Sequence, residues 1–526
     1  MRLPFSLIMG CLAIELLIPL NSAKAQEKTG KSLLLALEES LQDVIKQTEP
    51  SVACILVSRS DVYKNQWSDF PPADQPGKLG AFDPSGKPMP TMNNQMFRGR
   101  RGMNREASDD VGARRYDLSF SGYIPEAYGS GLVIDGEKLL ILTNYHVIHD
   151  AKKIYVRLPG EKGSYADIHA ADPQKDLAVL SLIDKSVKPL KPVKFGNGGD
   201  AKKGQFVVAI ANPYASGFRD GSPSASWGIV SNIQRRAAAN ANEAAGSPLL
   251  PSQKDEGLTA TFTVSTFIQT DAQILAGSSG GALVNLKGEV IGMLSSRAGL
   301  SGMEGVGGFA MPIDKDFKRI IEQLREGKEF QHGFLGISPD YDNKPGEGAL
   351  IGRLTSGGPA QLAGLNTRDC IVAVNGTPIR DFEDLVLAVS SLPAGSEARI
   401  ELRDRHPAIV TVKLTKTFVP GILASNRPKP VRGIRVDYQS AVEIERAKKV
   451  LQAPVISARG VGVSEVASGS PAEEARLYVG DIITEVNGQS VSEPDEFYKE
   501  ASKIPAAKTL VLTVAGARGI QRIEVP

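Results

Sequence analysis

Apolar residues follow two different spacings along the chain, and each spacing predicts one type of element. Over residues 32–48 the apolar positions recur every three or four residues, which is the spacing of one helical face, and Pro50 ends the pattern. The same spacing returns over residues 314–325, with Gly327 just beyond its end. Residues 52–57 form a continuous apolar run and predict a buried strand.

From residue 129 to residue 312 the chain consists of short apolar runs separated by turn residues, which is typical of two antiparallel β-barrels. A content of 53 Gly and 33 Pro suits such a turn-rich protein. Residues 59–127 and 236–257 lack the pattern, and we interpret both as loop insertions. The longer one is predicted to be either an interaction arm or an unstructured spacer, and the sequence favours neither.

The C-terminal part contains an internal repeat. A Pro-Ala motif at Pro359 returns at Pro471, 112 residues later, and each copy is followed by an Asp-x-Ile segment and a Val-Asn-Gly turn. Each copy predicts a short helix, a strand, an Asn-Gly turn and a second helix, over residues 382–392 or 494–504. The repeat therefore indicates two domains with one fold.

The N-terminus has the features of a secretory signal peptide. Arg2 precedes an apolar run to Leu20, and Ala23-Lys24-Ala25 fits the small-x-small cleavage pattern. We therefore predict that residues 1–25 are removed on export to the periplasm or cell envelope. A lipoprotein processing site at Cys11 is the weaker alternative, because the apolar run before it is short.

Length and charge bound the function only loosely. The 526 residues are sufficient for three or four domains, and a net charge of +2 implies no overall affinity for polyanions. Beyond the signal peptide, Cys54 and Cys370 each stand in an apolar run, which favours two buried thiols over a disulfide. No Cys/His spacing typical of a metal site is present, and we expect no cofactor.

The candidate chemistry begins at residues 277–282, Gly-Ser-Ser-Gly-Gly-Ala. A serine between glycines can stand on a tight loop with an accessible hydroxyl, and nearby backbone N–H groups can converge on one point. An acyl-transfer nucleophile needs both features. Most Gly/Ser-rich hexamers are turns or linkers, so this segment alone does not decide the function.

Two upstream residues complete a candidate catalytic set. His146 and Asp176 each adjoin an apolar run, which gives the chain order His146, Asp176, Ser279. Chymotrypsin-like proteases use this order, with the imidazole as the base for the serine and the carboxylate orienting the imidazole. His149 is an alternative histidine that we interpret as loop surface, and Asp172 is interpreted as a turn or cap residue.

Several further segments match one protease family: Gly129-Ser130-Gly131-Leu132, Thr143-Asn144-Tyr145-His146-Val147, Gly228-Ile229-Val230-Ser231, Gln269-Thr270-Asp271-Ala272 and Gly307-Gly308-Phe309-Ala310-Met311-Pro312. With the serine loop they resemble the HtrA (DegP-type) family of trypsin-like serine proteases, and the repeat resembles two PDZ domains. The resemblance implies a mainly β fold, with a chymotrypsin-like double antiparallel β-barrel followed by two PDZ (α+β) domains. Ser278 replaces the family's Asn, and Ala211 and Ala215 replace its glycines, which puts the conformation of neighbouring loops in question.

The resemblance also implies roles around the candidate triad. It places the oxyanion hole at the backbone N–H groups of Gly277 and Ser279. It places Ile274 in the substrate pocket, where an aliphatic lining suggests a small apolar residue before the cut. Arg297 falls in the facing loop, where the family commonly has an apolar residue.

PDZ domains bind an extended peptide as an added strand and capture its terminal carboxylate with backbone amides. The resemblance places this loop of the first copy at Phe334-Leu335-Gly336-Ile337, with a plain strand start as the alternative. Residues 433–436 are the nearest equivalent in the second copy. There we expect Arg435 to crowd the groove or to lie outside it.

The sequence thus predicts an exported, cofactor-free serine endopeptidase, with a protease domain over 26–330 and PDZ domains over 331–420 and 431–526. The resemblance implies degradation of misfolded or unfolded proteins, binding of peptide segments or C-termini, and a homo-oligomer built on trimers. No nucleic-acid partner and no transmembrane segment in the mature chain are expected. A proteolytically inactive chaperone or scaffold on the same fold is the alternative, and an intracellular signalling scaffold would require a retained N-terminus.

Overall fold

The computed structural model describes residues 20–59, 117–119, 125, 127–236, 265–296, 307–340, 346–419, 421, 423–442, 459–516 and 519–526. The start of the predicted signal peptide, Cys11, Arg297, the 236–257 insertion apart from residue 236, and most of the 59–127 insertion lie outside the described residues.

The first barrel contains six antiparallel strands in the order β5-β4-β1-β2-β3-β6, and β5 pairs with β6 to close it. Its strands are β1 (Val52–Ser58), β2 (Ala127–Asp135), β3 (Leu140–Thr143), β4 (Lys153–Leu158), β5 (Lys162–Asp172) and β6 (Leu177–Leu182). Every residue of β1 is buried, as its continuous apolar run predicted.

The second barrel is also closed and antiparallel, in the order β10-β11-β12-β9-β8-β7. Its strands are β7 (Phe206–Ala211), β8 (Ser224–Arg236), β9 (Thr266–Thr270), β10 (Ala282–Asn285), β11 (Val290–Leu294) and β12 (Gly308–Pro312). Apolar side chains from both barrels pack into one shared core. The predicted double-barrel fold is therefore confirmed.

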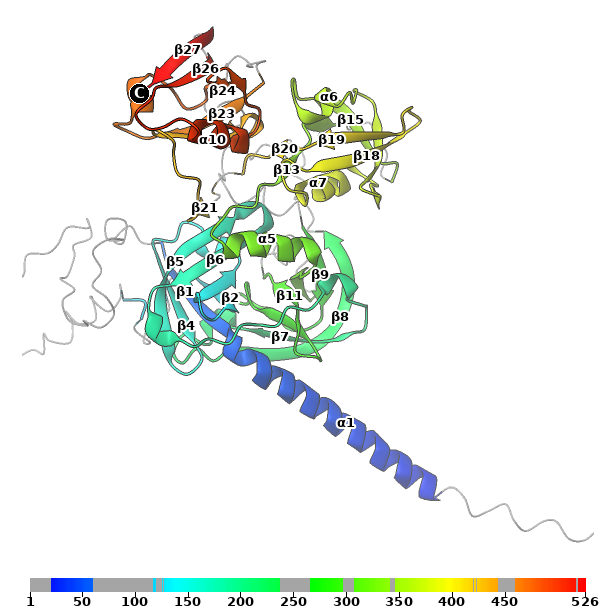
Figure 1. Cartoon of the computed structure of the whole chain (residues 1–526). Helices are drawn as coiled ribbons and strands as arrows, with labels where there is room; N and C mark the ends of the chain where they lie inside the picture. Colours follow the sequence, from blue (N-terminus) through cyan, green and yellow to red (C-terminus); the bar gives the residue numbers. More distant parts are fainter. Residues whose placement is uncertain are drawn as a thin grey trace, which may run out of the picture.

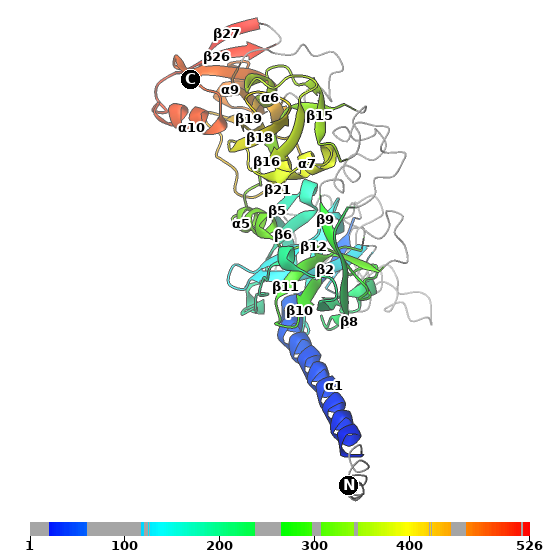
Figure 2. The same ribbon diagram turned by 90° about the vertical axis from the view of Figure 1, so that its right-hand side faces the viewer.

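Two longer helices flank the barrels. α1 (Leu20–Thr48) starts before the predicted residue 32 and extends away from the barrels, on the side opposite the two smaller sheets (Figures 1 and 2). Its C-terminal end is attached through Val44, which is buried in the shared core, whereas Leu33 and Leu34 are exposed. α5 (Lys315–Arg325) is capped by Asp314 and buries its apolar face in the same core, as predicted.

The repeat forms two small domains that lie beside one another above the barrels (Figure 1). The first contains β13 (Gly333–Phe334), β14 (Ile337–Pro339), β15 (Ala349–Leu354), α6 (Pro359–Leu362), β16 (Cys370–Val374), β17 (Thr377–Pro378), α7 (Phe382–Ser390), β18 (Glu397–Arg403), β19 (Ile409–Lys413) and β20 (Thr415–Lys416). The second contains β22 (Ile434–Tyr438), β23 (Val461–Val466), α9 (Pro471–Glu474), β24 (Ile482–Val486), β25 (Gln489–Ser490), α10 (Pro494–Ser502), β26 (Leu510–Gly516) and β27 (Gly519–Val525). Each has its own apolar core, as a repeated domain requires.

Two short segments attach to the first barrel in ways the sequence did not predict. β21 (Leu423–Ala424), in the linker between the small domains, pairs with β5. Leu118, within the predicted 59–127 insertion, is buried against Cys54. Asp117 accepts a hydrogen bond from the Tyr165 hydroxyl at 2.9 Å. Residues 117–119 are therefore packed on the barrel, although they lie within the predicted insertion.

Candidate active site

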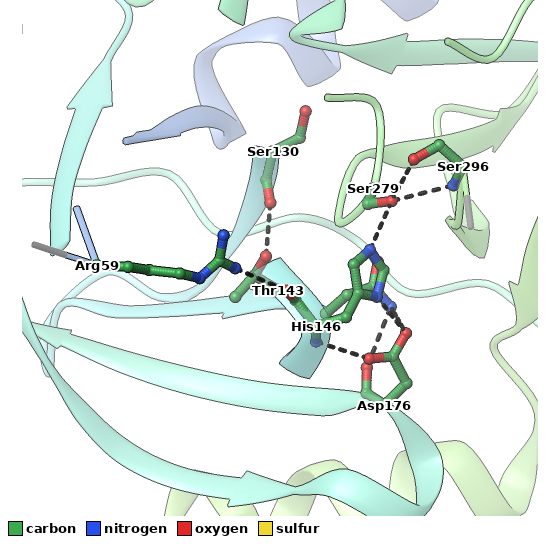
Figure 3. A network of polar contacts seen from close by, with 8 residues as sticks. Arg59, Ser130, Thr143, His146, Asp176, Ser279 and Ser296 are labelled. Atoms are coloured by element: carbon green, nitrogen blue, oxygen red, sulfur yellow. Dashed lines mark hydrogen bonds and ion pairs between the residues drawn. The ribbon is translucent and has the colours of Figure 1, made fainter. Parts of the chain in front are cut away.

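The three residues of the candidate triad meet where the two barrels face one another (Figure 3). His146 Nδ1 lies 2.7 Å from Asp176 Oδ2, and His146 Nε2 lies 3.0 Å from Ser279 Oγ. Both distances are those of normal hydrogen bonds. His146 and Asp176 belong to the first barrel and Ser279 to the loop before β10, so the set depends on the packing of both barrels.

His146 stands on the one-turn helix α3 (Tyr145–Ile148), directly after β3. Its backbone N–H donates to Asp176 Oδ1 at 2.9 Å, so Asp176 holds both the backbone and the ring of this histidine. Arg59 donates to the backbone carbonyl of His149, just beyond the end of α3, at 2.9 Å. It also donates to the backbone carbonyl of His146 at 3.4 Å (Figure 3). The His149 ring pairs instead with Asp150 at 3.2 Å, so it is not part of the set.

Asp176 is positioned by the turn that precedes it. It follows the 3-10 turn Pro173–Lys175 and has a left-handed backbone conformation, with φ of 53°. Asp172 Oδ1 caps that turn by accepting the N–H groups of Gln174 and Lys175 at 3.0 and 3.3 Å, which confirms the predicted cap. A non-glycine residue with positive φ costs free energy, so this turn is held by its cap and its neighbours.

The serine loop turns at Gly277 and Gly280, with φ of 92° and 86°, in a region that other residues rarely adopt. Ser130 in β2 holds this loop on both sides of the candidate nucleophile. Its N–H donates to the Ser279 carbonyl at 2.7 Å, and its hydroxyl donates to the Gly277 carbonyl at 2.8 Å. A Cβ at Gly280 would lie 2.0 Å from the Ser130 carbonyl oxygen, so the close approach requires glycine.

Ser130 is a residue whose role the sequence analysis missed. It is fully buried, and its hydroxyl also accepts the backbone N–H of Asn212 at 2.8 Å. Its segment, Gly129-Ser130-Gly131, was among those that resemble the family, but nothing in a single sequence pairs Ser130 with Ser279.

The two N–H groups predicted for the oxyanion hole can be judged from the hydrogen bonds of the carbonyls that share their peptide bonds. The carbonyl of Ala276 accepts the Tyr214 N–H at 2.7 Å, and the carbonyl of Ser278 accepts an N–H from later in the loop at 2.9 Å. In a trans peptide the N–H points opposite to the carbonyl, so the N–H groups of Gly277 and Ser279 are turned away from these partners. Within the described part of the chain neither N–H donates a hydrogen bond.

The predicted pocket residue, Ile274, lies on the same loop, five residues before Ser279. It is half-buried at the edge of the second-barrel core. A Cβ at Gly308 in β12 would lie 2.2 Å from Ile274 Cδ1, so the glycine leaves the space that Ile274 occupies.

The predicted carboxylate-binding loop, Phe334 to Ile337, connects β13 to β14. Gly336 has a φ of 79°, and the carbonyls of Leu335 and Gly336 accept hydrogen bonds from elsewhere in the same domain. Among the described strands, β14 pairs only with β15, so its other edge is unpaired. A peptide strand could be added at that edge.

A buried histidine connects the first small domain to the turn before Asp176, and the sequence analysis missed it. His332 Nε2 lies 2.8 Å from Asp172 Oδ2, and His332 Nδ1 lies 2.7 Å from the Ser390 carbonyl oxygen at the end of α7. Both side chains of the pair are fully buried. The two ring nitrogens of His332 thus connect the end of α7 to the turn before Asp176.

Neither described thiol has the features of a reactive nucleophile. Burial raises the pKa of the Cys54 thiol to about 12, which keeps it protonated at neutral pH. Burial also raises the pKa of Cys370, which is half-buried rather than buried as predicted, and both thiols are free. The described residues contain no His/Cys/Asp/Glu group able to hold a metal ion and no helix able to cross a membrane.

Comparisons with known proteins identify the families of the two parts of the chain. The trypsin-like peptidase domain family matches residues 129–293, and the PDZ domain family matches residues 351–404 and 462–515. The crystal structure of a serine endoprotease from Yersinia pestis is similar over 72% of this chain and 97% of the Yersinia chain, with 23% sequence identity and a TM-score of 0.41.

Curated relatives match over a longer part of the chain. A probable periplasmic serine endoprotease, DegP-like, from Pseudomonas fluorescens is 33% identical over 403 residues, covering 74% of this chain and 77% of the relative. The periplasmic pH-dependent serine endoprotease DegQ of Escherichia coli is 28% identical over 415 residues, which cover 76% of this chain and 80% of the relative. The chain is therefore a serine endopeptidase that belongs to the family of DegP-like periplasmic serine endoproteases.

Proposed function

We propose that Ser279 is the nucleophile of this endopeptidase and that His146 and Asp176 complete its triad. His146 Nε2 takes the proton of Ser279 as Oγ attacks the peptide carbonyl, and His146 then gives that proton to the leaving amine. Asp176 orients the ring and stabilises its charged form. A water molecule, deprotonated by His146, then hydrolyses the acyl-enzyme and restores Ser279.

The N–H groups of Gly277 and Ser279 are proposed to stabilise the oxyanion of each tetrahedral intermediate. Removal of one such donor typically costs a factor of ~10²–10³ in turnover. Ile274 is proposed to line the pocket for the residue before the cut, which favours small apolar side chains there.

The observation that carries this proposal is the continuous pair of hydrogen bonds, 2.7 Å from Asp176 to His146 and 3.0 Å from His146 to Ser279. An inactive scaffold has no need to hold an imidazole between a carboxylate and a hydroxyl on different barrels. Nothing in the described residues favours that alternative.

The substrate class follows from the family and from the two small domains. We propose that the protein acts in the periplasm on misfolded or unfolded proteins, and that it binds peptide segments or C-termini through its PDZ domains. The Phe334–Ile337 loop would capture the terminal carboxylate of such a peptide, and the unpaired edge of β14 would receive the peptide as a strand. The protease domain is assigned to residues 26–330, and the PDZ domains to 331–420 and 431–526.

We also propose that the mature protein is a homo-oligomer built on trimers, as is implied by its family. Static light scattering of the mature chain measures this directly. A mass of three protomers or a multiple of three is expected, and a monomer would overturn the assembly proposal without affecting the chemistry.

Digestion of casein tests the proposed nucleophile. Replacing Ser279 by Ala should lower the rate by a factor of at least ~10³, because the residual rate comes only from binding and the oxyanion hole. The exposed Ser231 in β8 offers a matched control, and Ser231→Ala should digest casein like the wild type. Equal digestion by the wild type and Ser279→Ala would refute the proposal.

A further inference from the structure

A second hydroxyl lies against the candidate nucleophile. Ser296 Oγ lies 2.7 Å from Ser279 Oγ, and the Ser296 backbone N–H donates to Ser279 Oγ at 3.0 Å. With His146 Nε2 at 3.0 Å, Ser279 Oγ thus has three polar neighbours (Figure 3). Neither the proposed relay nor the oxyanion hole uses Ser296.

The hydrogen-bonding capacity of one hydroxyl limits how these neighbours can be arranged. A serine hydroxyl has one proton to donate and two lone pairs to accept. If Ser279 donates to His146, the N–H and the hydroxyl of Ser296 occupy both lone pairs. If Ser279 donates to Ser296 Oγ instead, its proton is directed away from the base. In both arrangements the Ser296 hydroxyl opposes attack.

The residues just before Ser296 are held by backbone hydrogen bonds, whereas the Ser296 hydroxyl can rotate. Leu294 N–H donates to the Gly281 carbonyl at 2.8 Å, and Ser295 N–H donates to the Phe309 carbonyl in β12 at 2.9 Å. These bonds tie the segment to the serine loop and to the second barrel. Rotation of Ser296 about its Cα–Cβ bond, between ordinary staggered positions, removes the hydroxyl without moving the strand.

We propose that Ser296 is a further residue of the catalytic site, whose hydroxyl holds Ser279 in a resting hydrogen bond that must break before each attack. The proposal rests on Ser279 as the proposed nucleophile. Rotation of Ser296 leaves its backbone N–H in place and frees one lone pair of Ser279 Oγ for the substrate carbonyl. The resting hydrogen bond of Ser296 thereby slows acylation.

The rate at which phenylmethylsulfonyl fluoride modifies Ser279 in the full chain tests this inference. In that reaction the Oγ–S bond forms, the S–F bond breaks, the serine proton goes to His146 and fluoride leaves. A net neutral hydrogen bond is worth about a two- to ten-fold change in rate, so Ser296→Ala should be modified faster than the wild type by that factor. Ser296→Gly, which also lacks the hydroxyl, should behave in the same way.

Ser295 supplies the matched control, because its buried hydroxyl has no hydrogen-bond partner within the described residues. Ser295→Ala should therefore be modified at the wild-type rate. If Ser296→Ala and Ser296→Gly are modified at Ser279 no faster than the wild type, this inference fails and the proposed nucleophile stands. If no variant is modified at Ser279, the proposed function fails and the inference fails with it.

Discussion

The two PDZ copies share their backbone register and differ at the edge that would receive a peptide. In the first, Ile337 pairs with Leu354, and in the second Ile434 pairs with Val466. Both edge strands have a register shift at the same place, just before Pro339 in the first copy and just before Val436 in the second. Duplication has thus preserved even an irregularity of the strand.

At this shared position, neither edge strand offers a backbone N–H to an added strand, and the reason differs between the two copies. Pro339 has no N–H, so β14 cannot donate to an added strand there. The N–H of Val436 donates to the Tyr498 hydroxyl of α10 at 3.3 Å, which places this side chain over the edge of β22. Val386 stands at the position of Tyr498 in α7 and has no hydroxyl. The two copies thus share a backbone register and differ in what occupies the edge strand.

The copies also differ in how they are attached to the rest of the chain. The first is connected to the turn before Asp176 through the buried pair of His332 and Asp172. The second is attached through Lys416, whose ammonium group contacts Asp437 at 2.6 Å and also contacts Glu329. Burial would lower the pKa of Lys416, but these two carboxylates outweigh it and raise that pKa. Of these two attachments, only the first reaches the turn before Asp176.

Breaking the first attachment should give the largest effect. Removing one partner of a buried pair typically costs about 3–5 kcal/mol, so His332→Ala should strongly lower the free energy of unfolding. Because Asp172 caps the turn before Asp176, kcat on a peptide substrate should fall as well. Chemical denaturation and initial rates measure the two effects. The neighbouring Gln331→Ala is the control, and equal behaviour of the two variants would remove the distinction between the attachments.

Removing the Tyr498 side chain from the edge of β22, in the second copy, should have a smaller effect, and this effect should be on peptide binding. In a Ser279→Ala background, which prevents cleavage, Tyr498→Ala frees the Val436 N–H and should strengthen binding of a C-terminal peptide by about two- to ten-fold. Fluorescence anisotropy measures this affinity, and the exposed Tyr478→Ala is the control. Unchanged affinity in Tyr498→Ala would show that this side chain does not close the groove.

Restoring a backbone N–H at position 339 of the first copy tests the difference between the two edge strands. Pro339→Ala supplies an N–H on β14, and one added backbone hydrogen bond should tighten peptide binding by up to about ten-fold. Pro378→Ala, on the exposed strand β17, removes a proline without changing the edge and should bind like the parent. Weaker binding by Pro339→Ala would place the peptide elsewhere.

The smallest expected effect concerns the helix that carries Tyr498. Hydrogen bonds from the N–H and hydroxyl of Ser492 and from the N–H of Glu493 hold the pKa of Glu496 below its usual value, with burial opposing them. A lowered folded-state pKa means that this stabilisation is present above the unfolded pKa of about 4.3 and is lost as the pH falls through the lower folded value.

At pH 7 the free energy of unfolding of Glu496→Gln should therefore be about 0.5 kcal/mol below that of the wild type, a value reduced for solvent screening. Between pH 5 and pH 3 the free energy of unfolding should fall less in this variant than in the wild type. Thermal unfolding across that range measures the difference. Glu474→Gln, at an exposed position of α9, should keep the wild-type pH dependence, and parallel curves for all three proteins would contradict the assignment.

Much of the fold was predictable because it depends on local pattern. The run over residues 52–57, the spacing over 314–325 and the repeat all became the expected elements, since hydrophobic period and turn residues act over a few positions. The triad could be proposed because each of its members stands in a segment that closely resembles the protease family. Their approach to within hydrogen-bond distance was not visible in the sequence.

The residues that the sequence did not reveal act over long distances. Ser130 is paired with Ser279, and His332 is paired with Asp172. The two residues of each pair are more than a hundred positions apart in the sequence, and neither pair follows a spacing rule. β21 pairs with β5 although two residues form no recognisable strand pattern. Ser296 lies only 17 residues after Ser279, but this pair follows no spacing rule either, because the packing of the second barrel places the two hydroxyls together.

The central claim is that one imidazole activates one hydroxyl across the junction of the two barrels. Mapping the residue modified by a fluorophosphonate, in the wild type and in His146→Ala, tests it most directly. We expect covalent modification at Ser279 in the wild type and its loss in His146→Ala. Modification at a different residue, or undiminished modification of Ser279 without His146, would contradict the account.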